Sequence, residues 1–342
     1  MEKLLTIVVP AFNMEKYLRR CIDSICIESV MNRVQVIVVN DGSKDRTSEI
    51  AHEYEQKYPH YIQVIDKENG NYGSCMNVGL SLAKGKYFRT LDADDWYNTD
   101  AYEKFVKELE NTDADMIITT RIELLESSGE KRIRGIDNSI ICNQDIHVSD
   151  DIWGKYGLVF VASTTFKVQI LISVGMTWDE NAFYTDNEYI TIPLKSVKTV
   201  RFIDYPVYSY MIGRAEQSVS PDNLKKYYDS HLLVTRRLIS TVLNEQYKNS
   251  GNYEIIKKIL LISLLPHVYR TLLYEGRKNK TIIHEIDKEL QSKDFSIYQA
   301  VDFTDDFKGA KYIYAYHHNK LLYCYIRSNY LIRNLAHKFL GK

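Results

Sequence analysis

Short apolar runs alternate with helix-like segments in the first part of the chain. Short runs typical of buried strands occupy residues 5–10, 34–39, 61–65 and 87–91, and the first of them is rich in Val and Ile. Segments with apolar residues at helical spacing lie between them, at residues 15–28, 45–57 and 74–84. Strands that alternate with helices in this way predict βαβ units and a mainly parallel central sheet, an α/β fold of the Rossmann-like kind.

Farther along, the pattern becomes mixed and then helical. The sequence predicts a helix at 100–110, a hairpin from 116–125 and 131–134, a short helix at 166–174 and a strand at 201–210. Residues 135–160 have no clear period. After residue 220 the apolar spacing is helical, and Pro266 predicts a kink within the apolar run 255–273. We therefore expect an α/β domain at 1–218 and a helical C-terminal region at 219–342.

Polar residues follow three of the predicted parallel strands. They lie at positions 11–13, 41–43 and 92–95. Ligands of open parallel sheets bind beyond the carboxyl ends of the strands, so these three segments are expected to meet in one cleft.

Composition and charge exclude several classes of protein. The 342 residues include 44 Lys and Arg against 45 Asp and Glu, so no net field attracts the chain to nucleic acid. No apolar run reaches the ~18 residues that span a bilayer, and residues 4–10 lack the cleavage site of a signal peptide. The five cysteines are an odd number without CxxC spacing, which disfavours a disulfide framework and a zinc site. We expect a cytoplasmic protein.

The segment 311–342 differs from the rest of the chain. It contains Lys and Arg residues and six tyrosines but no Asp or Glu. A basic, aromatic segment of this kind is typical of a peripheral contact with a membrane surface. A last helix that packs on the domain, or on a second copy in a homo-oligomer, has the same pattern, and the sequence does not separate these readings.

The acidic cluster at the end of the fourth strand carries the strongest chemical signal. Asp92, Asp94 and Asp95 repel one another unless a hard cation neutralises them, and Mg²⁺ or Mn²⁺ held by carboxylates commonly bridges a diphosphate. A solvated turn with Asp as a helix cap is the other reading. Asp41 has two readings as well, because a carboxylate there accepts the imide N–H of a uracil ring or caps the next helix together with Ser43 or Asp45.

Three motifs of known nucleotide-binding proteins are missing. No GxGxxG follows the first strand, which disfavours a Rossmann oxidoreductase, and no GxxxxGK[ST] of a P-loop protein occurs. The sequence also lacks the QxxRW motif of membrane-embedded sugar polymerases.

Three strings resemble those of the family 2 inverting glycosyltransferases, which have the GT-A fold. Residues 6–13 read TIVVPAFN, residues 38–43 read VVNDGS and residues 91–96 read LDADDW. The resemblance implies a nucleotide-sugar donor, usually linked to UDP, a Mn²⁺ or Mg²⁺ ion, and a role in bacterial surface-polysaccharide synthesis.

The resemblance also implies roles for individual residues. Donor-binding positions would be Pro10, Phe12, Asn13, Asp41, Ser43, Asn69, Gly70, Asn77, Asp92, Ala93, Asp94 and Arg214. Asp94 and Asp92 would bind the metal, with Asp95 as an alternative ligand. The family often has Arg-Asn after the glycine turn, but here Met76 precedes Asn77. Arg214 lies in a string at 208–218 that is similar to a loop folding over the donor diphosphate.

An inverting transferase needs a general base on the acceptor side of the cleft. The family usually supplies it from a Glu-Asp pair after an aromatic residue, and here Thr185 replaces the first acid while Asp186 keeps the second. Glu188 is the fallback, and a helix cap is the structural alternative for Asp186. The expected acceptor is a hydroxyl of a cell-surface glycan or a lipid-linked molecule.

Two functions of other classes compete with this interpretation. A non-catalytic nucleotide-sugar-binding scaffold subunit would keep the donor cleft without needing Asp186. A sugar nucleotidyltransferase would need a glycine-rich basic loop after the first strand, where this chain has Pro-Ala-Phe-Asn at 10–13.

Overall fold

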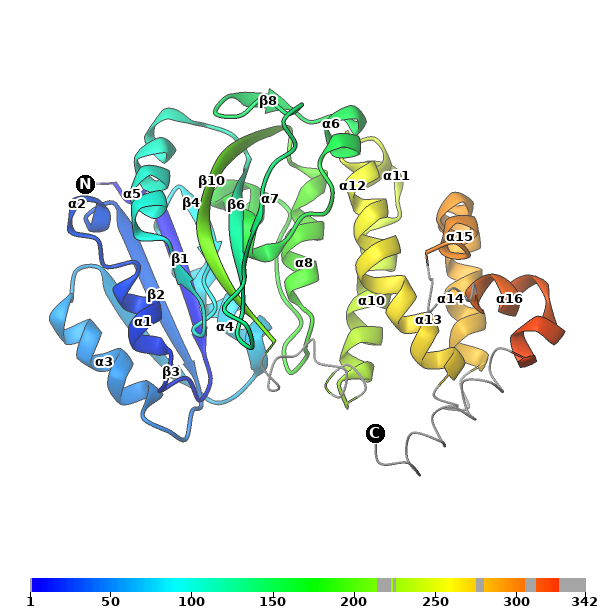
Figure 1. Ribbon diagram of the computed structural model, residues 1–342, viewed down its shortest axis with the longest axis horizontal. Coiled ribbons are helices and arrows are strands. Elements are labelled where there is room, and N and C mark those ends of the chain that lie inside the picture. Colours follow the sequence, from blue (N-terminus) through cyan, green and yellow to red (C-terminus); the bar gives the residue numbers. More distant parts are fainter. Residues whose placement is uncertain (1, 214–222, 224–225, 275–279, 305–311, 326–342) are drawn as a thin grey trace.

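The computed structural model describes residues 2–213, 223, 226–274, 280–304 and 312–325. Within this part of the chain, ten strands form one mixed sheet, and helices cover both of its faces (Figure 1). The main path of the sheet runs β3-β2-β1-β4-β9-β6-β10-β5, with β7 paired to β6 and β8 paired to β10.

The N-terminal half of the sheet is parallel, as the sequence predicts. Its strands are β1 (Leu5–Ala11), β2 (Val34–Asp41), β3 (Ile62–Lys67) and β4 (Tyr87–Thr90). Ala11 of β1 pairs with Asn40 of β2, and the main-chain N–H of Leu91 donates to the carbonyl of Val8. The polar segments after β1, β2 and β4 therefore emerge at the same edge of the sheet.

The other half of the sheet is mixed in direction. Its strands are β5 (Trp96–Tyr97), β6 (Met116–Leu125), β7 (Lys131–Arg134), β8 (Asp145–His147), β9 (Thr164–Lys167) and β10 (Thr199–Ile212). β9 runs antiparallel to both β4 and β6, which it joins, while β6 and β10 are parallel. This half of the sheet brings β5 and β10 together beside the segment that follows β4.

Alternating residues of the parallel strands belong to two separate cores. Ile7 and Val9 of β1 pack in one apolar cluster with helices α1 and α3, whereas Val8 packs in the other with α4. Successive side chains of a strand point to opposite faces of its sheet, and strands covered on both faces are continuously apolar. The covering helices are α1 (Leu18–Asp23), α2 (Glu28–Met31), α3 (Thr47–Lys57), α4 (Asn71–Ser81) and α5 (Thr99–Glu108).

The structure corrects the bounds of two predicted helices. Within 15–28 only Leu18–Asp23 forms a helix, α1, and the next helix, α2, begins at Glu28. The helix predicted at 166–174 is present as α7 (Val168–Ser173), but the first two residues of the predicted range belong to β9, which pairs with β4 and β6. The unassigned stretch 135–160 contains β8 and helix α6 (Asp150–Lys155).

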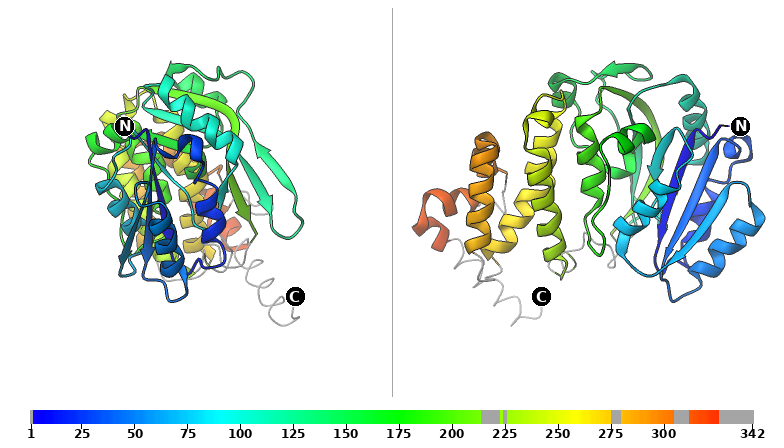
Figure 2. Two further views of the ribbon diagram at one scale, coloured as in Figure 1. Left: turned by 90° about the vertical axis from the view of Figure 1, so that its left-hand side faces the viewer. Right: turned by 180° about the vertical axis from the view of Figure 1, so that it is seen from behind.

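The C-terminal region is helical, as predicted, and it packs against the edge of the domain that carries α8 (Asp186–Thr191). Figure 2 shows α10 next to α8 and the last helices farthest from the parallel strands. Its helices are α10 (Tyr228–Val242), α11 (Glu245–Lys248), α12 (Tyr253–Lys258), α13 (Leu265–Tyr274), α14 (Lys280–Lys293), α15 (Phe295–Val301) and α16 (Tyr312–His318). Among the described residues, no helix has the length and apolarity needed to cross a bilayer.

The irregularity predicted near Pro266 takes the form of a π-helical stretch. Residues Ile259–Leu264 have π-helical hydrogen bonding between α12 and α13. Pro266 lacks an N–H and its ring clashes with the carbonyl four residues earlier in an α-helix, and a wider turn relieves that clash. The predicted domain boundary at 218 and most of the basic part of 311–342 lie outside the described residues.

Candidate active site

The ends of β1 and β2 are joined by side-chain hydrogen bonds. The main-chain N–H of Asn13 donates to Oγ of Ser43 at 3.0 Å, and Oδ1 of Asn13 accepts from the N–H of Lys44 at 2.8 Å. Asn13 has a φ of 56°, a left-handed conformation that Asn tolerates better than most residues. Beside it, Pro10 is half-buried and the ring of Phe12 is 46% exposed, which leaves an apolar surface at the rim of the cleft.

The carboxylate of Asp41 is buried at the end of β2 and accepts two hydrogen bonds. Its Oδ1 accepts from Nζ of Lys67 at 2.8 Å and from the main-chain N–H of Gly70 at 2.9 Å. Nδ2 of Asn69 donates to the carbonyl of Asp41 at 2.9 Å. The predicted nucleotide residues Asp41, Asn69 and Gly70 therefore form one connected group. The helix α3 is capped separately, because Oδ1 of Asp45 accepts the N–H of Thr47.

The glycine turn before α4 packs directly on the chain around residue 179. A Cβ atom at Gly73 would lie 2.0 Å from the carbonyl oxygen of Asp179, so only glycine fits there without a shift of the backbone. The carbonyl of Gly70 accepts the main-chain N–H of Asn181 at 2.8 Å.

Asn77 fastens the same segment from α4. Its Oδ1 accepts the N–H of Trp178 at 2.9 Å, and its Nδ2 donates to the carbonyl of Trp178 and to Oε1 of Glu180, both at 3.0 Å. Asn77 was predicted to bind the donor, but its side chain is already hydrogen-bonded to Trp178 and Glu180.

The acids after β4 lie close together. Asp92, Asp94 and Asp95 each have a carboxylate oxygen that lies within 4.8 Å of those of the other two. Asp92 and Asp94 are half-buried, whereas Asp95 and the intervening Ala93 are buried. Burial and the negative charge of Asp92 raise the pKa of Asp95 well above its ordinary value. Closely spaced carboxylate oxygens suit Mg²⁺ or Mn²⁺, so the donor set fits a divalent cation.

The strand β10 and helix α1 hold this acidic turn in place. Oδ2 of Asp95 accepts from the hydroxyl of Tyr208 at 2.9 Å, and Oδ1 accepts from the N–H of Met211 at 2.8 Å. Nη2 of Arg20 donates to the carbonyl of Asp94 at 2.7 Å, and its guanidinium stacks 3.8 Å from the Trp96 ring centroid. Asp95 thus orients the turn, while Asp92 and Asp94 are only half-buried.

Asp186 is the first residue of α8 and is half-buried. Loss of water around its carboxylate raises its pKa, while hydrogen bonds from the N–H and the side chain of Asn187 work in the other direction. The preceding Tyr184 has a φ of 66°, which is strained for a bulky residue. The alternative that Asp186 caps the helix is wrong, because the N-cap of α8 is Thr185, without a side-chain cap hydrogen bond, and Asp186 is the first helical residue.

Two tyrosines connect Asp186 with the acidic cluster. The pKa of Tyr72 is raised by burial and by the charges of both Asp92 and Asp186. The pKa of Tyr210 is raised by burial and by Asp92, Asp95 and Asp186. The charges of Asp92 and Asp186 therefore act in the same direction on both phenol groups.

Glu188 is unsuited to the role of fallback base. Its side chain has no exposed surface, and burial raises its pKa to about 7. Its Oε2 accepts the N–H of Asp179 at 2.9 Å, and its Oε1 lies 2.8 Å from Nη1 of Arg237. Both oxygens therefore serve the structure of the segment.

Sequence reasoning missed several residues of this site. Lys67, Tyr72, Tyr208, Tyr210 and Arg237 contact or surround its acids. Tyr208 and Tyr210 do lie in the string at 208–218 that is similar to a donor loop, but that resemblance gave them no role, and nothing in the sequence pairs Arg237 with Glu188. Arg214, a predicted donor residue, lies outside the described residues.

Comparison with known proteins agrees with this geometry. Residues 6–155 match the family model described as Glycosyl transferase family 2. Glycosyltransferase GlyA of Streptococcus pneumoniae is 36% identical over 125 residues, which cover 36% of this chain and 18% of that protein. The minor teichoic acid biosynthesis protein GgaB of Bacillus subtilis is 24% identical over 327 residues, which cover 90% of this chain and 36% of GgaB. The chain thus matches about a third or less of these relatives' length.

A solved structure shares the fold across nearly the whole chain. The structure of S. aureus TarS 1-349 in complex with UDP-GlcNAc has a TM-score of 0.64 at 16% identity, and the match covers 96% of this chain and 91% of that one. The predicted fold class, a GT-A α/β domain with a C-terminal helical region, is therefore confirmed.

Proposed function

Because residues 6–155 of this chain belong to glycosyl transferase family 2, we propose that the protein is a metal-dependent inverting glycosyltransferase. It moves a sugar from a UDP-sugar to a hydroxyl group of a cell-surface glycan or of a lipid-linked acceptor. The observation that supports this proposal best is the cluster of Asp92, Asp94 and Asp95 after β4, whose carboxylate oxygens lie within 4.8 Å of one another.

The donor half of the proposal rests on the ends of β1, β2 and β4. The uracil ring binds beside Asp41, and the diphosphate lies near Asp92 and Asp94. These two carboxylates hold Mn²⁺ or Mg²⁺, which when bound supplies positive charge to the diphosphate leaving group. The solved structures of TarS in complex with UDP-GlcNAc and with UDP support a UDP-sugar as the first donor to try.

The acceptor half rests on Asp186. Its carboxylate takes the proton of the acceptor hydroxyl while that oxygen attacks the anomeric carbon of the sugar. The bond between that carbon and the diphosphate oxygen breaks, UDP leaves with the electron pair, and the configuration at the anomeric carbon inverts. The raised pKa of Asp186 makes it a stronger base than an exposed aspartate.

The acceptor class and the location are the broader part of the proposal. The name of GgaB, a minor teichoic acid biosynthesis protein, supports a cell-wall polymer or its precursor as acceptor. We place the reaction on the cytoplasmic side of the membrane, with residues 311–342 in contact with lipid, acceptor or a second copy of the chain.

Binding and turnover measurements test the proposal. We expect calorimetry to detect UDP binding that strengthens on addition of Mn²⁺, and we expect slow UDP release from UDP-GlcNAc, UDP-glucose or UDP-galactose. Tighter binding of GDP or dTDP would move the donor assignment away from uracil. UDP binding without release of UDP from any of these sugars, with or without candidate acceptors, would favour the scaffold subunit.

A further inference from the structure

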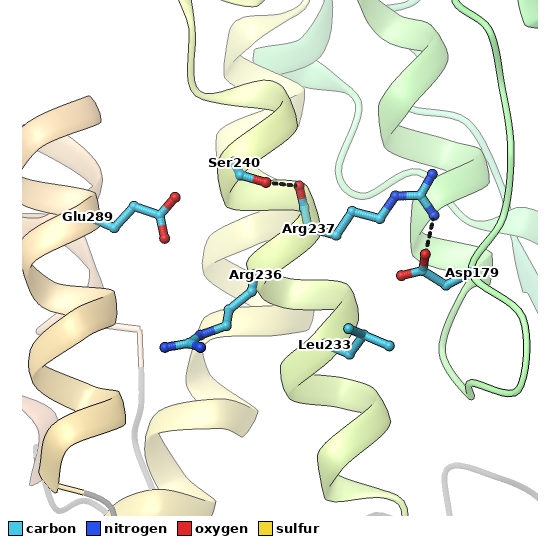
Figure 3. Close-up of a pocket in the computed structure, with 6 residues that line it drawn as sticks. All are labelled: Asp179, Leu233, Arg236, Arg237, Ser240 and Glu289. Atoms are coloured by element: carbon cyan, nitrogen blue, oxygen red, sulfur yellow. Dashed lines mark hydrogen bonds and ion pairs between the residues drawn. The ribbon is translucent and has the colours of Figure 1, made fainter.

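One side chain of the C-terminal region, Arg237 of α10, reaches the segment that carries Asp186. Its Nη1 lies 2.8 Å from Oδ1 of Asp179 and 2.8 Å from Oε1 of Glu188. Its Nη2 donates to the carbonyl oxygen of Thr177 at 2.8 Å and to the Thr177 hydroxyl at 3.1 Å. Figure 3 shows Arg237 extended toward Asp179, whereas Arg236 points to the other side of α10, where Glu289 of α14 lies.

The three partners of Arg237 span both ends of the segment 177–188. Glu188 itself closes the segment, because its Oε2 accepts the N–H of Asp179. Asp186 lies two residues before Glu188 on the same helix. A guanidinium that binds residues 177, 179 and 188 together therefore fixes the position from which Asp186 projects.

The backbone of this segment needs such support. Asn181 and Tyr184 have φ angles of 56° and 66°. Left-handed conformations of non-glycine residues are unfavourable and persist only where the surrounding structure holds them. Asn77 and Gly70 hold the segment from the donor side, and Arg237 holds it from the C-terminal side.

Charge and burial make the contact with Arg237 hard to replace. Glu188 has no exposed surface, and the side chain of Arg237 is 24% exposed. A buried carboxylate that loses its cationic partner is left without compensation, which is far less favourable than an intact pair. Removal of the guanidinium would therefore disturb the segment at Glu188, next to the proposed base.

We propose that Arg237 is a positioning residue of the active site, which holds the segment 177–188 and with it the start of α8, where Asp186 lies. The C-terminal helix α10 is then a working part of the catalytic unit. This inference rests on the proposed function, because it assigns Asp186 the role of base.

The test compares Arg237→Gln with Arg236→Gln, a matched control. Arg236 is the neighbouring arginine of α10 and pairs with Glu285 of α14, away from the segment. UDP release from UDP-GlcNAc with Mn²⁺ is measured for both. A misplaced catalytic group costs about tenfold or more in rate, so we expect kcat of Arg237→Gln to fall by that factor with KM nearly unchanged. Arg236→Gln should match the wild type.

A double variant separates positioning from loss of the fold. Arg237→Gln combined with Glu188→Gln removes the uncompensated carboxylate, while the amide oxygen still accepts the N–H of Asp179. We expect this variant to recover most of the lost kcat. If Arg237→Gln does not fold, Arg237→Lys replaces it, and a lower kcat is expected because one ammonium group cannot serve three partners in the fork geometry of arginine.

Hydrogen exchange gives a readout that does not depend on turnover. In Arg237→Gln we expect faster exchange of the amides of 179–190 and unchanged exchange in β2. Any one of four results would overturn the inference. These are a kcat of Arg237→Gln equal to that of the wild type, an equal loss of kcat in Arg236→Gln, no recovery of kcat in the double variant, or unchanged amide exchange at 179–190. A wild-type protein that releases no UDP would count against the proposed function instead, and exchange alone would then decide whether Arg237 holds the segment.

Discussion

Nζ of Lys67 lies 2.8 Å from Oδ1 of Asp41, at the point where β3 and β2 end side by side. The main-chain N–H of Gly70 donates to the same carboxylate oxygen. Nζ of Lys67 also donates to the carbonyl of Glu68 and to Oγ of Ser74, so its three donors are used within the protein, and the carboxylate of Asp41 is the group that would recognise the base. Uracil has a ring N–H that a carboxylate accepts, whereas cytosine has an acceptor at that ring nitrogen.

We expect the wild-type protein to bind UDP at least about tenfold more tightly than CDP, because a hydrogen-bonding site discriminates strongly against a ligand that leaves it unpaired. Asp41→Asn should reduce this preference, since its amide keeps the bond from Gly70 but loses the negative charge. Calorimetric titration of both nucleotides measures the ratio. Equal affinities for UDP and CDP in the wild type would remove the uracil role of Asp41.

Asp94→Ala should abolish the increase in UDP affinity that Mn²⁺ produces, because it removes one of the closely spaced carboxylates. Titrations of UDP with and without Mn²⁺ give the comparison. Asp100→Ala is the control, since Asp100 is an exposed acid of α5 outside the cluster. A Mn²⁺ effect that survives in Asp94→Ala would show that the metal binds elsewhere.

Asp186→Asn should keep UDP affinity and lose turnover by about 10²–10⁴-fold, the usual contribution of a general base. Glu180→Gln serves as the control on the same segment, because an amide oxygen can still accept the bond that Glu180 receives from Asn77. UDP release and UDP binding are measured on the same preparations. Normal turnover in Asp186→Asn would end the assignment of Asp186 as base.

Gly73→Ala should destabilise the protein by roughly 1–3 kcal/mol, the range for forced overpacking. The added Cβ would meet the carbonyl oxygen of Asp179 at 2.0 Å. Gly154→Ala is the control, because a Cβ at Gly154 in α6 meets open space and alanine favours helix. Urea unfolding of both variants measures the difference, and a Gly73→Ala protein as stable as Gly154→Ala would contradict the close approach of α4 to residue 179.

Glu188 gives the stability of the protein a defined dependence on pH. Burial raises its pKa from 4.5 to about 7 in the folded protein. At a pH between these two pKa values, Glu188 holds a proton in the folded state that the unfolded chain has released. Its contribution to the free energy of unfolding therefore falls as pH rises, by up to ~1.4 kcal/mol per pH unit. We expect Glu188→Gln to have a shallower decline than the wild type between pH 4.5 and 7 in urea titrations. Parallel pH profiles of the two proteins would refute the raised pKa.

The sequence was a sufficient guide where local pattern and strand geometry decide the structure. The apolar runs of β1, β2 and β4 are buried on both faces, and the rule that parallel strands end at one edge brings Asp41 and Asp92 to the same cleft. Asn13 and Ser43, predicted at the same site, hydrogen-bond to each other across two strand ends.

The contacts that complete the site depend on pairs far apart in the chain, which no local pattern encodes. The bond from Tyr208 to Asp95 spans 113 residues, and the bond from Asn77 to Trp178 spans 101. The strand β9 was not predicted for a similar reason, since its pairing with β4 is set by tertiary structure rather than by its own residues. Such placements follow from the packing of the whole domain.

The position of β9 between β4 and β6 also limits how this protein can be shortened. The part that matches the family model ends at residue 155, before β9 begins at Thr164. An expression fragment cut at that boundary would lose the strand that joins the two halves of the sheet, together with the partners of Asp95 on β10. The stretch that matches the family model is thus shorter than the smallest piece expected to fold, and a useful fragment must extend at least through the end of β10.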